Sequence, residues 1–312
     1  MDFDLFDKKG IKPMLIKDMK NPFNSPEWLY ELKLDGIRCI AYLDKVSTDL
    51  RNKRDMKLLP RFPELYDINK CVKKKCILDG ELVVLKNGVP DFYEVQKRTT
   101  MNDKFKIQLA NTKYPASFVA FDIIYLEDKE VTDLELIERK KLLEDIIIDN
   151  KKCAFARYII ENGIGLYEVA DQQKLEGVVA KKLESKYWFG KESRDWIKFK
   201  RMADEDFIIC GFTKKNEMST ILLGQYKGDK LVYKGSVSFG VRYNLLLENK
   251  DLIIDYSPFN LTPTDVYNNE ITWLKPVLVC IVEYMPNTKN SLRQPVFKGL
   301  RDDVLPYQCQ VK

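Results

Sequence analysis

A lysine in the segment Trp28–Arg38 has the surroundings of a covalent nucleophile. The segment reads Trp-Leu-Tyr-Glu-Leu-Lys-Leu-Asp-Gly-Ile-Arg, in which apolar residues alternate with Glu31, Lys33 and Asp35. A strand places alternate side chains on opposite faces, so Glu31 and Lys33 are expected to share the face away from the apolar residues. A neutral lysine amine can form a covalent bond to phosphorus. The pattern therefore predicts a nucleophile, Lys33, at the end of a rigid strand.

The residues after Lys33 read as a hairpin. Asp35-Gly36 is a tight-turn signal, and Ile37–Leu43 has the composition of a returning strand. This arrangement places Arg38 just past the turn. A lysine beside a turn is most often a solvated flank, so the chemical interpretation depends on what else the chain contains.

Other segments along the chain combine charged residues with strand-like apolar runs. They are Leu78–Glu81, Phe118–Asp122, Glu176–Lys182, Trp196–Lys200 and the terminal Ser291–Asp303. In order and spacing they resemble the nucleotidyltransferase motifs of the ATP-dependent DNA ligases, and the resemblance runs from about Lys12 to the C-terminus.

Composition limits the chemistry. The 312 residues contain no histidine, which excludes histidine-based triads and histidine zinc sites. Seven cysteines without a Cys-x-x-Cys pair argue against a disulfide framework and a four-cysteine zinc site. The formal charge is only +5, so a polyanionic partner would be met by local patches. Catalysis is expected to rest on lysine, arginine, carboxylates and a metal ion.

The chain carries no membrane signal. It lacks a basic N-terminal segment followed by an apolar stretch, and no apolar run approaches the ~20 residues that span a bilayer. We expect a soluble, intracellular protein with no membrane partner. The resemblance implies a monomer of bacterial or viral origin.

Strands and helices alternate in the first two thirds of the chain. Strands are predicted at 31–43, 76–85, 118–126, 176–182 and 196–201, and helices at 93–101, 134–148 and 166–175. Short strands dominate after residue 203, with one helical patch at Tyr243–Leu252. The predicted fold class is α+β. An adenylation (nucleotidyltransferase) domain over 1–202, with mixed or antiparallel sheets, precedes an all-β domain over 203–312. Strand content favours a small barrel, and the resemblance implies an OB fold.

The resemblance implies roles for the nucleotide-binding residues. Lys33 would take AMP from ATP, Phe121 would stack on adenine, and Glu31 would accept a hydrogen bond from the adenine amino group. Lys198 and Lys200 share one strand face, where they would contact phosphates and favour the neutral form of a nearby amine. The expected cofactor-binding set is Glu31, Leu32, Arg38, Glu81, Phe121, Lys198 and Lys200.

Two glutamates are candidates for holding Mg²⁺ or Mn²⁺. Glu176 opens the apolar run Gly-Val-Val-Ala, where an ionised side chain needs a partner such as a metal or a hydroxyl. The resemblance gives Glu176 the metal role and gives Glu81 a place in the sugar and metal environment. Asp79 is an alternative to Glu81.

Arginines are candidates for phosphate contacts. Arg51 matches a family motif imperfectly, because Leu50 stands where Ser or Thr is usual, and Arg54 is the alternative. In the last motif Arg293 and Arg301 would orient pyrophosphate. Val304 replaces the usual lysine, so that role is absent or falls to Lys298.

The predicted function is that of a DNA ligase that seals 5'-phosphate/3'-hydroxyl breaks in duplex DNA through lysyl-AMP and DNA-adenylate. The segments Ser193–Trp196 and Pro60–Leu65 resemble the ligase modules of bacterial end-joining proteins. Nicked or broken duplex DNA is the expected partner, and end-joining or clamp partners stay open. The alternatives are an mRNA capping guanylyltransferase, an RNA ligase, or a non-catalytic nucleic-acid-binding protein.

Overall fold

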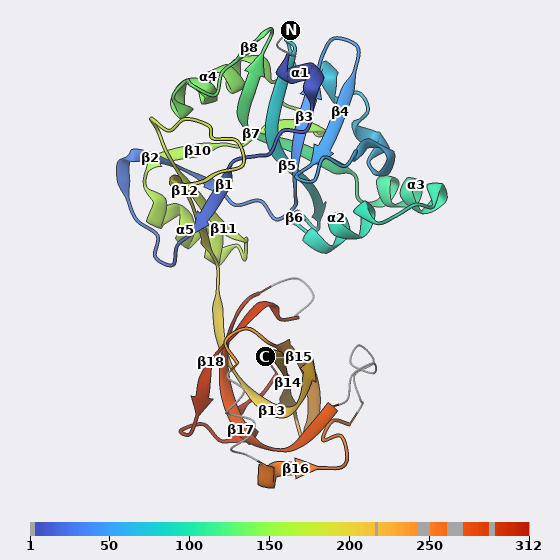
Figure 1. Ribbon diagram of the computed structural model, residues 1–312, viewed down its shortest axis with the longest axis vertical. Coiled ribbons are helices and arrows are strands. Elements are labelled where there is room, and N and C mark those ends of the chain that lie inside the picture. Colours follow the sequence, from blue (N-terminus) through green and yellow to red (C-terminus); the bar gives the residue numbers. More distant parts are fainter. Residues whose placement is uncertain (1–3, 216–217, 242–249, 261–270, 287–290, 312) are drawn as a thin grey trace. The chain divides into compact units, whose positions relative to one another are not determined.

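The computed structural model describes residues 4–215, 218–241, 250–260, 271–286 and 291–311. The chain divides into two compact units, Met1–Lys200 and Arg201–Lys312 (Figure 1). The first contains both helices and sheets, and the described part of the second is built mainly from strands.

Two mixed sheets form the first unit. The larger has the order β4 (Thr48–Asn52), β3 (Ile37–Leu43), β5 (Cys76–Lys86), β7 (Ala116–Leu126) and β8 (Lys129–Glu130), with β6 (Val89–Pro90) beside β5 and β9 (Cys153–Phe155) beside β7. The smaller has the order β1 (Leu15–Asp18), β12 (Glu192–Lys200), β11 (Gly177–Lys182), β2 (Ser25–Leu32) and β10 (Tyr158–Glu161). The strands predicted beyond the nucleophile segment all form, and the predicted mixed sheets are confirmed.

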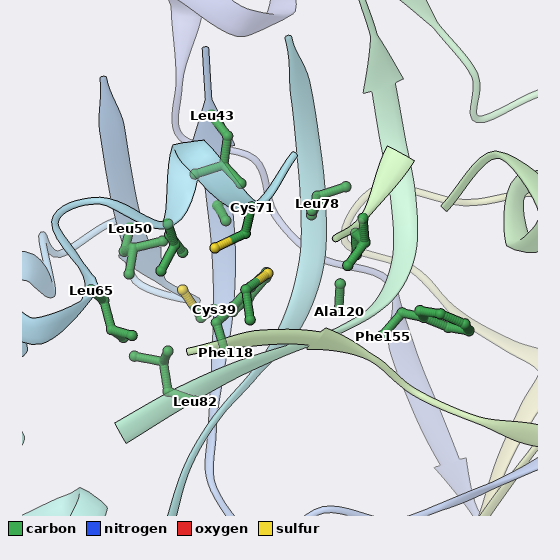
Figure 2. Close-up of a cluster of buried hydrophobic side chains, with 14 of the residues drawn as sticks. Cys39, Leu43, Leu50, Leu65, Cys71, Leu78, Leu82, Phe118, Ala120 and Phe155 are labelled. Carbon is green, nitrogen blue, oxygen red and sulfur yellow. The ribbon is translucent and has the colours of Figure 1, made fainter. Parts of the chain in front are cut away.

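Both faces of the larger sheet are apolar. Cys39 and Ala41 of β3 enter one buried cluster, whereas Ile40 and Tyr42 enter another, as the twofold alternation of a strand requires. Figure 2 shows part of the first cluster, with side chains from β3, β4, β5 and β7. The second cluster also includes Trp196 of the smaller sheet, so it forms the contact between the two sheets.

Helices cover the sheets of the first unit. They are α1 (Leu5–Lys8), α2 (Phe92–Thr99), α3 (Lys104–Lys113), α4 (Leu136–Ile146) and α5 (Gly163–Gln172). Three of them form close to the predicted ranges, whereas α1 and α3 have no sequence prediction. The apolar residues of α3 are poorly segregated, and Phe105 and Leu109 are exposed, so no apolar stripe predicts this helix.

The predicted hairpin around Asp35-Gly36 is wrong. β2 pairs with β10 and β11, and β3 pairs with β4 and β5, so residues 33–36 cross from one sheet to the other. Gly36 is required for close approach rather than for a turn: a Cβ there would lie 2.2 Å from the Leu82 carbonyl oxygen. Asp-Gly therefore marks a crossing point at which the backbone passes close to β5.

The second unit is an OB-fold barrel. Its sheet has the order β15 (Lys230–Val237), β14 (Met218–Lys227), β13 (Ala203–Lys215), β17 (Ile271–Met285) and β16 (Ile253–Ile254), with β18 (Arg293–Arg301) paired to β17. Phe207, Leu223 and Val282 lie in its core. Of the predicted helical patch, Lys250–Leu252 forms a 3₁₀ turn and 243–249 lie outside the described residues.

All seven cysteines are buried thiols without a disulfide bond, as composition predicts. Among the described residues, no helix is long and apolar enough to cross a bilayer.

Candidate active site

A pocket lies where the two sheets of the first unit meet. β2 supplies Glu31 and Leu32, the crossing segment supplies Lys33 and Leu34, and β3, β5 and β7 supply Arg38, Glu81 and Phe121. Ile16, Ala156, Val179 and Lys181 complete the lining. The fold thus brings together predicted site residues from three separate segments of the sequence.

Lys33 is held at the end of the paired strands β2 and β11. Its backbone N–H donates to the Gly177 carbonyl at 2.9 Å, and its Nζ lies 2.7 Å from Glu176 Oε2. The Lys33 side chain is 20% exposed and that of Glu176 only 5%. The amine therefore faces the pocket with a nearly buried carboxylate beside it.

Glu31 is buried, although strand alternation places it opposite the apolar face. Its Oε2 lies 2.7 Å from Lys181 Nζ, and its Oε1 pairs with Lys140 of α4. Two ammonium groups thus compensate the burial of this carboxylate. Burial lowers the pKa of Lys181 to about 8, with Glu31 opposing that shift and Lys140 reinforcing it.

Glu81 lies opposite Arg38 in the β3–β5 pairing and lines the pocket. Burial raises the pKa of Glu81 to about 8; Lys33 and Arg38 oppose this shift, whereas Glu176 and Asp79 add to it. A carboxyl with that pKa is largely protonated at neutral pH.

Arg38 is fixed by Asp79. Its Nε donates to Asp79 Oδ1 at 2.7 Å and its Nη2 to Asp79 Oδ2 at 2.5 Å, and the Tyr187 hydroxyl donates to the same carboxylate at 2.6 Å. The guanidinium lies 4.9 Å from the centre of the Phe121 ring. Asp79 is fully buried and committed to Arg38, which argues against Asp79 as the alternative to Glu81.

Lys198 and Lys200 point to one face of β12, as alternation predicts, and share one aspartate. Each Nζ lies 3.1 Å from a carboxylate oxygen of Asp18. Burial alone would raise the pKa of Asp18, but hydrogen bonds from Lys200 and Lys198 outweigh it and lower that pKa. Neither lysine lines the pocket, yet Lys198 donates to the carbonyl of Ile16, which does. No sequence pattern predicted that these two lysines would share an aspartate.

Arg51 and Arg54 lie outside the pocket lining. Arg51 is on β4, at the edge of the larger sheet, where its guanidinium pairs with Asp49 and Asp55 at 3.0 and 2.9 Å. Arg54 is exposed in the turn that follows β4. Arg54 therefore faces solvent, whereas the Arg51 side chain is only 16% exposed and is held by two carboxylates.

The last predicted motif lies on the second unit. Arg301 on β18 pairs with Asp303, at 2.7 Å from Nε, and with Asp206 at 3.2 Å, while Arg293 opens the same strand. Lys298 pairs with Glu283 on β17. Val304, where the resemblance leads one to expect lysine, packs against a small apolar cluster.

The donor set suits a divalent cation bound together with a nucleotide. Among the described residues no group of three acidic, histidine or cysteine side chains is placed to hold a metal. Mg²⁺, however, is commonly held by one or two carboxylates plus substrate phosphates. The Glu176 charge contributes to the raised pKa of Glu81, and a cation near these two carboxylates would relieve their repulsion.

Two lysines of the site, Lys140 and Lys181, are absent from the predicted set. Each is only 1% exposed. Lys181 follows the apolar run Val-Val-Ala in β11, and Lys140 stands four residues after buried Leu136 in α4. A charge at a core position of a strand or helix is the sequence signal that identifies them.

These two units, a nucleotidyltransferase fold and an OB fold, define the class of covalent nucleotidyltransferases with a C-terminal barrel. Residues 13–200 match the ATP dependent DNA ligase domain, and residues 214–304 match the ATP dependent DNA ligase C terminal region. The chain belongs to the ATP-dependent DNA ligase family.

Relatives of this chain include end-joining proteins. The multifunctional non-homologous end joining protein LigD of Pseudomonas aeruginosa is 31% identical over 293 residues, covering 89% of this chain and 34% of the relative. The SPbeta prophage-derived DNA ligase-like protein LigB of Bacillus subtilis is 31% identical, covering 66% of this chain and 73% of the relative. The chain thus spans about a third of the first relative.

Solved structures agree with the family. A mycobacterial DNA ligase D complexed with ATP and MES is 25% identical, with a TM-score of 0.57 over 99% of this chain and all of that one. ATP use is therefore supported by a related structure as well as by the family match.

Proposed function

We propose that this chain is an ATP-dependent DNA ligase that uses Lys33 as its nucleophile. The Lys33 Nζ attacks the α-phosphorus of ATP, a P–N bond forms, and the bond to pyrophosphate breaks. AMP then passes to the 5'-phosphate of broken DNA, and a 3'-hydroxyl displaces AMP to close the backbone. The observation that carries this proposal is the position of Lys33 in one pocket with Glu31, Arg38, Glu81 and Phe121.

The pocket offers the groups that a bound adenylate needs. The Phe121 ring presents a flat apolar surface for a base, Glu31 offers a carboxylate acceptor, and Arg38 offers positive charge held in place by Asp79. Leu32, the last residue of β2, also lines the pocket. Lys198 and Lys200 would contact phosphate oxygens in place of their present partner, the Asp18 carboxylate.

We assign the metal role to Glu176 and Glu81. When bound, Mg²⁺ or Mn²⁺ would neutralise charge on the phosphates as pyrophosphate leaves. The burial of Glu81 and its repulsion by Glu176 support this assignment. Glu176 would then bind the cation in place of the Lys33 ammonium group. The Lys33 amine would be released from this ion pair and would stay beside the pocket.

Nicked or broken duplex DNA is the proposed substrate, and end joining is the proposed setting, since relatives are named for non-homologous end joining. Arg51 and Arg54 are proposed to contact DNA phosphates. Arg293 and Arg301 are proposed to orient pyrophosphate, with Arg301 exchanging Asp303 for the ligand. The packing of partly buried Val304 against a small apolar cluster supports assigning no lysine role there. We propose that the enzyme acts as a monomer.

The test is covalent labelling followed by nick sealing. The protein is incubated with α-labelled ATP or GTP and Mg²⁺, denatured, and assayed for bound label. We expect acid-labile label from ATP in the wild type and in Lys53→Ala, whose lysine is exposed in a turn, and none in Lys33→Ala. Protein already carrying AMP is first discharged with pyrophosphate.

Nicked duplex DNA then serves as the second substrate. Loss of label from the protein together with joined DNA would support the ligase. Label from GTP alone would replace the proposal with a capping enzyme, and DNA binding without any adduct would replace it with a binding protein.

A further inference from the structure

Glu31 is enclosed by two lysines that come from separate elements. Lys140, from α4, takes Oε1, and Lys181, from β11, takes Oε2 at 2.7 Å. All three side chains are at least 96% buried. Two ammonium groups and one carboxylate, with a net charge of +1, thus lie beside the pocket and are almost entirely shielded from solvent.

Lys181 has further contacts that fix it in place. Its Nζ donates to the Phe121 carbonyl at 3.3 Å and lies 4.4 Å from the centre of the Phe121 ring and 4.3 Å from that of Trp196. Lys140 lies 5.5 Å from the centre of the Tyr158 ring. Because aromatic faces and carboxylate oxygens both attract cations, each ammonium has one favoured position.

We propose that Lys140 and Lys181 are positioning residues that hold Glu31 as a fixed, ionised acceptor, and that this clamp selects ATP over 6-oxopurine nucleotides. This inference rests on the proposed function, in which the pocket binds the nucleotide. Neither lysine needs to touch the base: their effect passes through the Glu31 carboxylate.

The selection follows from hydrogen-bond chemistry. The 6-amino group of adenine donates, whereas the 6-oxo group of hypoxanthine or guanine only accepts. A carboxylate that receives a proton donor on each oxygen keeps lone pairs for an amino group and has no hydrogen to offer a carbonyl. Removing Lys140 leaves the Glu31 Oε1 without the partner that fixes its position, so the carboxylate no longer has one set orientation toward an amino group. The advantage of a 6-amino over a 6-oxo substituent then falls.

The experiment measures labelling of Lys33 by α-labelled ATP and by α-labelled ITP, which differs from ATP in the 6-substituent of the base. In Lys140→Met we expect the ratio of ATP to ITP labelling efficiency to fall by about tenfold or more, the scale of a lost charged hydrogen bond. The change is expected in KM rather than in the maximal rate. Lys141→Met, whose lysine is the exposed neighbour on α4, is the matched control and keeps the wild-type ratio.

Other variants separate positioning from folding. Lys140→Arg retains the charge and is expected to restore most of the ratio, and Glu31→Gln, whose amide can donate, is expected to shift it toward ITP. If Lys140→Met does not fold, as judged by its thermal transition, Lys140→Gln and Glu31→Gln provide the same comparison.

An equal loss of labelling with both nucleotides, or an unchanged ratio in Glu31→Gln and in the folded Lys140 variants, would overturn the clamp. A wild-type protein that acquires no label from ATP would instead overturn the proposed function, so the two failures are distinct.

Discussion

The Nζ of Lys33 and the carboxylate of Glu176 form an ion pair at 2.7 Å, at the end of the strand pair β2–β11. The proposed nucleophile therefore lies beside an anion, and a cation bound by Glu176, as proposed, would compete with the lysine for that carboxylate. Metal binding and the state of the lysine would then be coupled through this one carboxylate.

Glu176→Gln is expected to reduce labelling of Lys33 by ATP about 100-fold, because the amide binds a divalent cation poorly and transition-state charge is left uncompensated. The rate is measured as a function of Mg²⁺ concentration. Glu168→Gln, at an exposed position of α5, is the control. A variant that labels at the wild-type rate would remove Glu176 from the metal site.

Glu81→Gln is expected to stabilise the metal-free protein at higher pH. The pKa of Glu81 is raised to about 8 by burial, whereas an unperturbed glutamate titrates near 4.5. Between these values the unfolded chain releases a proton that the folded protein keeps, so rising pH favours unfolding. Glutamine removes that effect.

Thermal unfolding of both proteins at pH 5, 6.5 and 8 provides the check. The difference in Tm between Glu81→Gln and wild type should grow with pH. A difference that is independent of pH would contradict the raised pKa.

Asp79→Asn is expected to lower the free energy of unfolding by about 3 kcal/mol, because it leaves the Arg38 guanidinium partly uncompensated in a buried site. Urea unfolding measures this change, and Asp133→Asn, whose side chain is 93% exposed, should change stability by less than about 0.5 kcal/mol. Equal effects of the two substitutions would show that the Arg38–Asp79 pair does not stabilise the fold.

Asp18→Asn is expected to leave stability within about 1 kcal/mol, since the Asp18 side chain is 61% exposed and such pairs contribute little. Its effect should appear in nucleotide binding. Lys198 and Lys200 would no longer have to break ion pairs with Asp18 before they contact phosphate, so KM for ATP should fall several-fold. Steady-state labelling over a range of ATP concentrations tests this, with thermal unfolding alongside. A raised KM would assign Asp18 a supporting role instead.

The sequence predicted best what local pattern determines. The strand of Lys198 and Lys200 alternates as expected, because a twofold period is set by the backbone alone. The grouping of Lys33 with Phe121 came from the resemblance, since residues far apart in a chain carry no local signal of contact.

Pairing between strands could not be predicted in the same way. Asp35-Gly36 has turn chemistry, and only the packing of Gly36 against the Leu82 carbonyl distinguishes a crossing from a hairpin. The apolar periodicity of α4 does not identify Lys140, because the buried face of this helix also includes Arg139 and Lys140. Buried charges obey the same helical period as leucines, but their partners lie elsewhere in the chain.

The crossing segment gives residue 36 an unusual experimental use. Two sheets are tied together within a few residues of Lys33, and the space left at Gly36 is smaller than a methyl group requires. We expect any side chain there to push the chain at residue 36 away from β5, and with it Arg38 away from Glu81. A graded series from glycine to alanine to serine would therefore vary the width of the pocket without altering any chemical group that lines it.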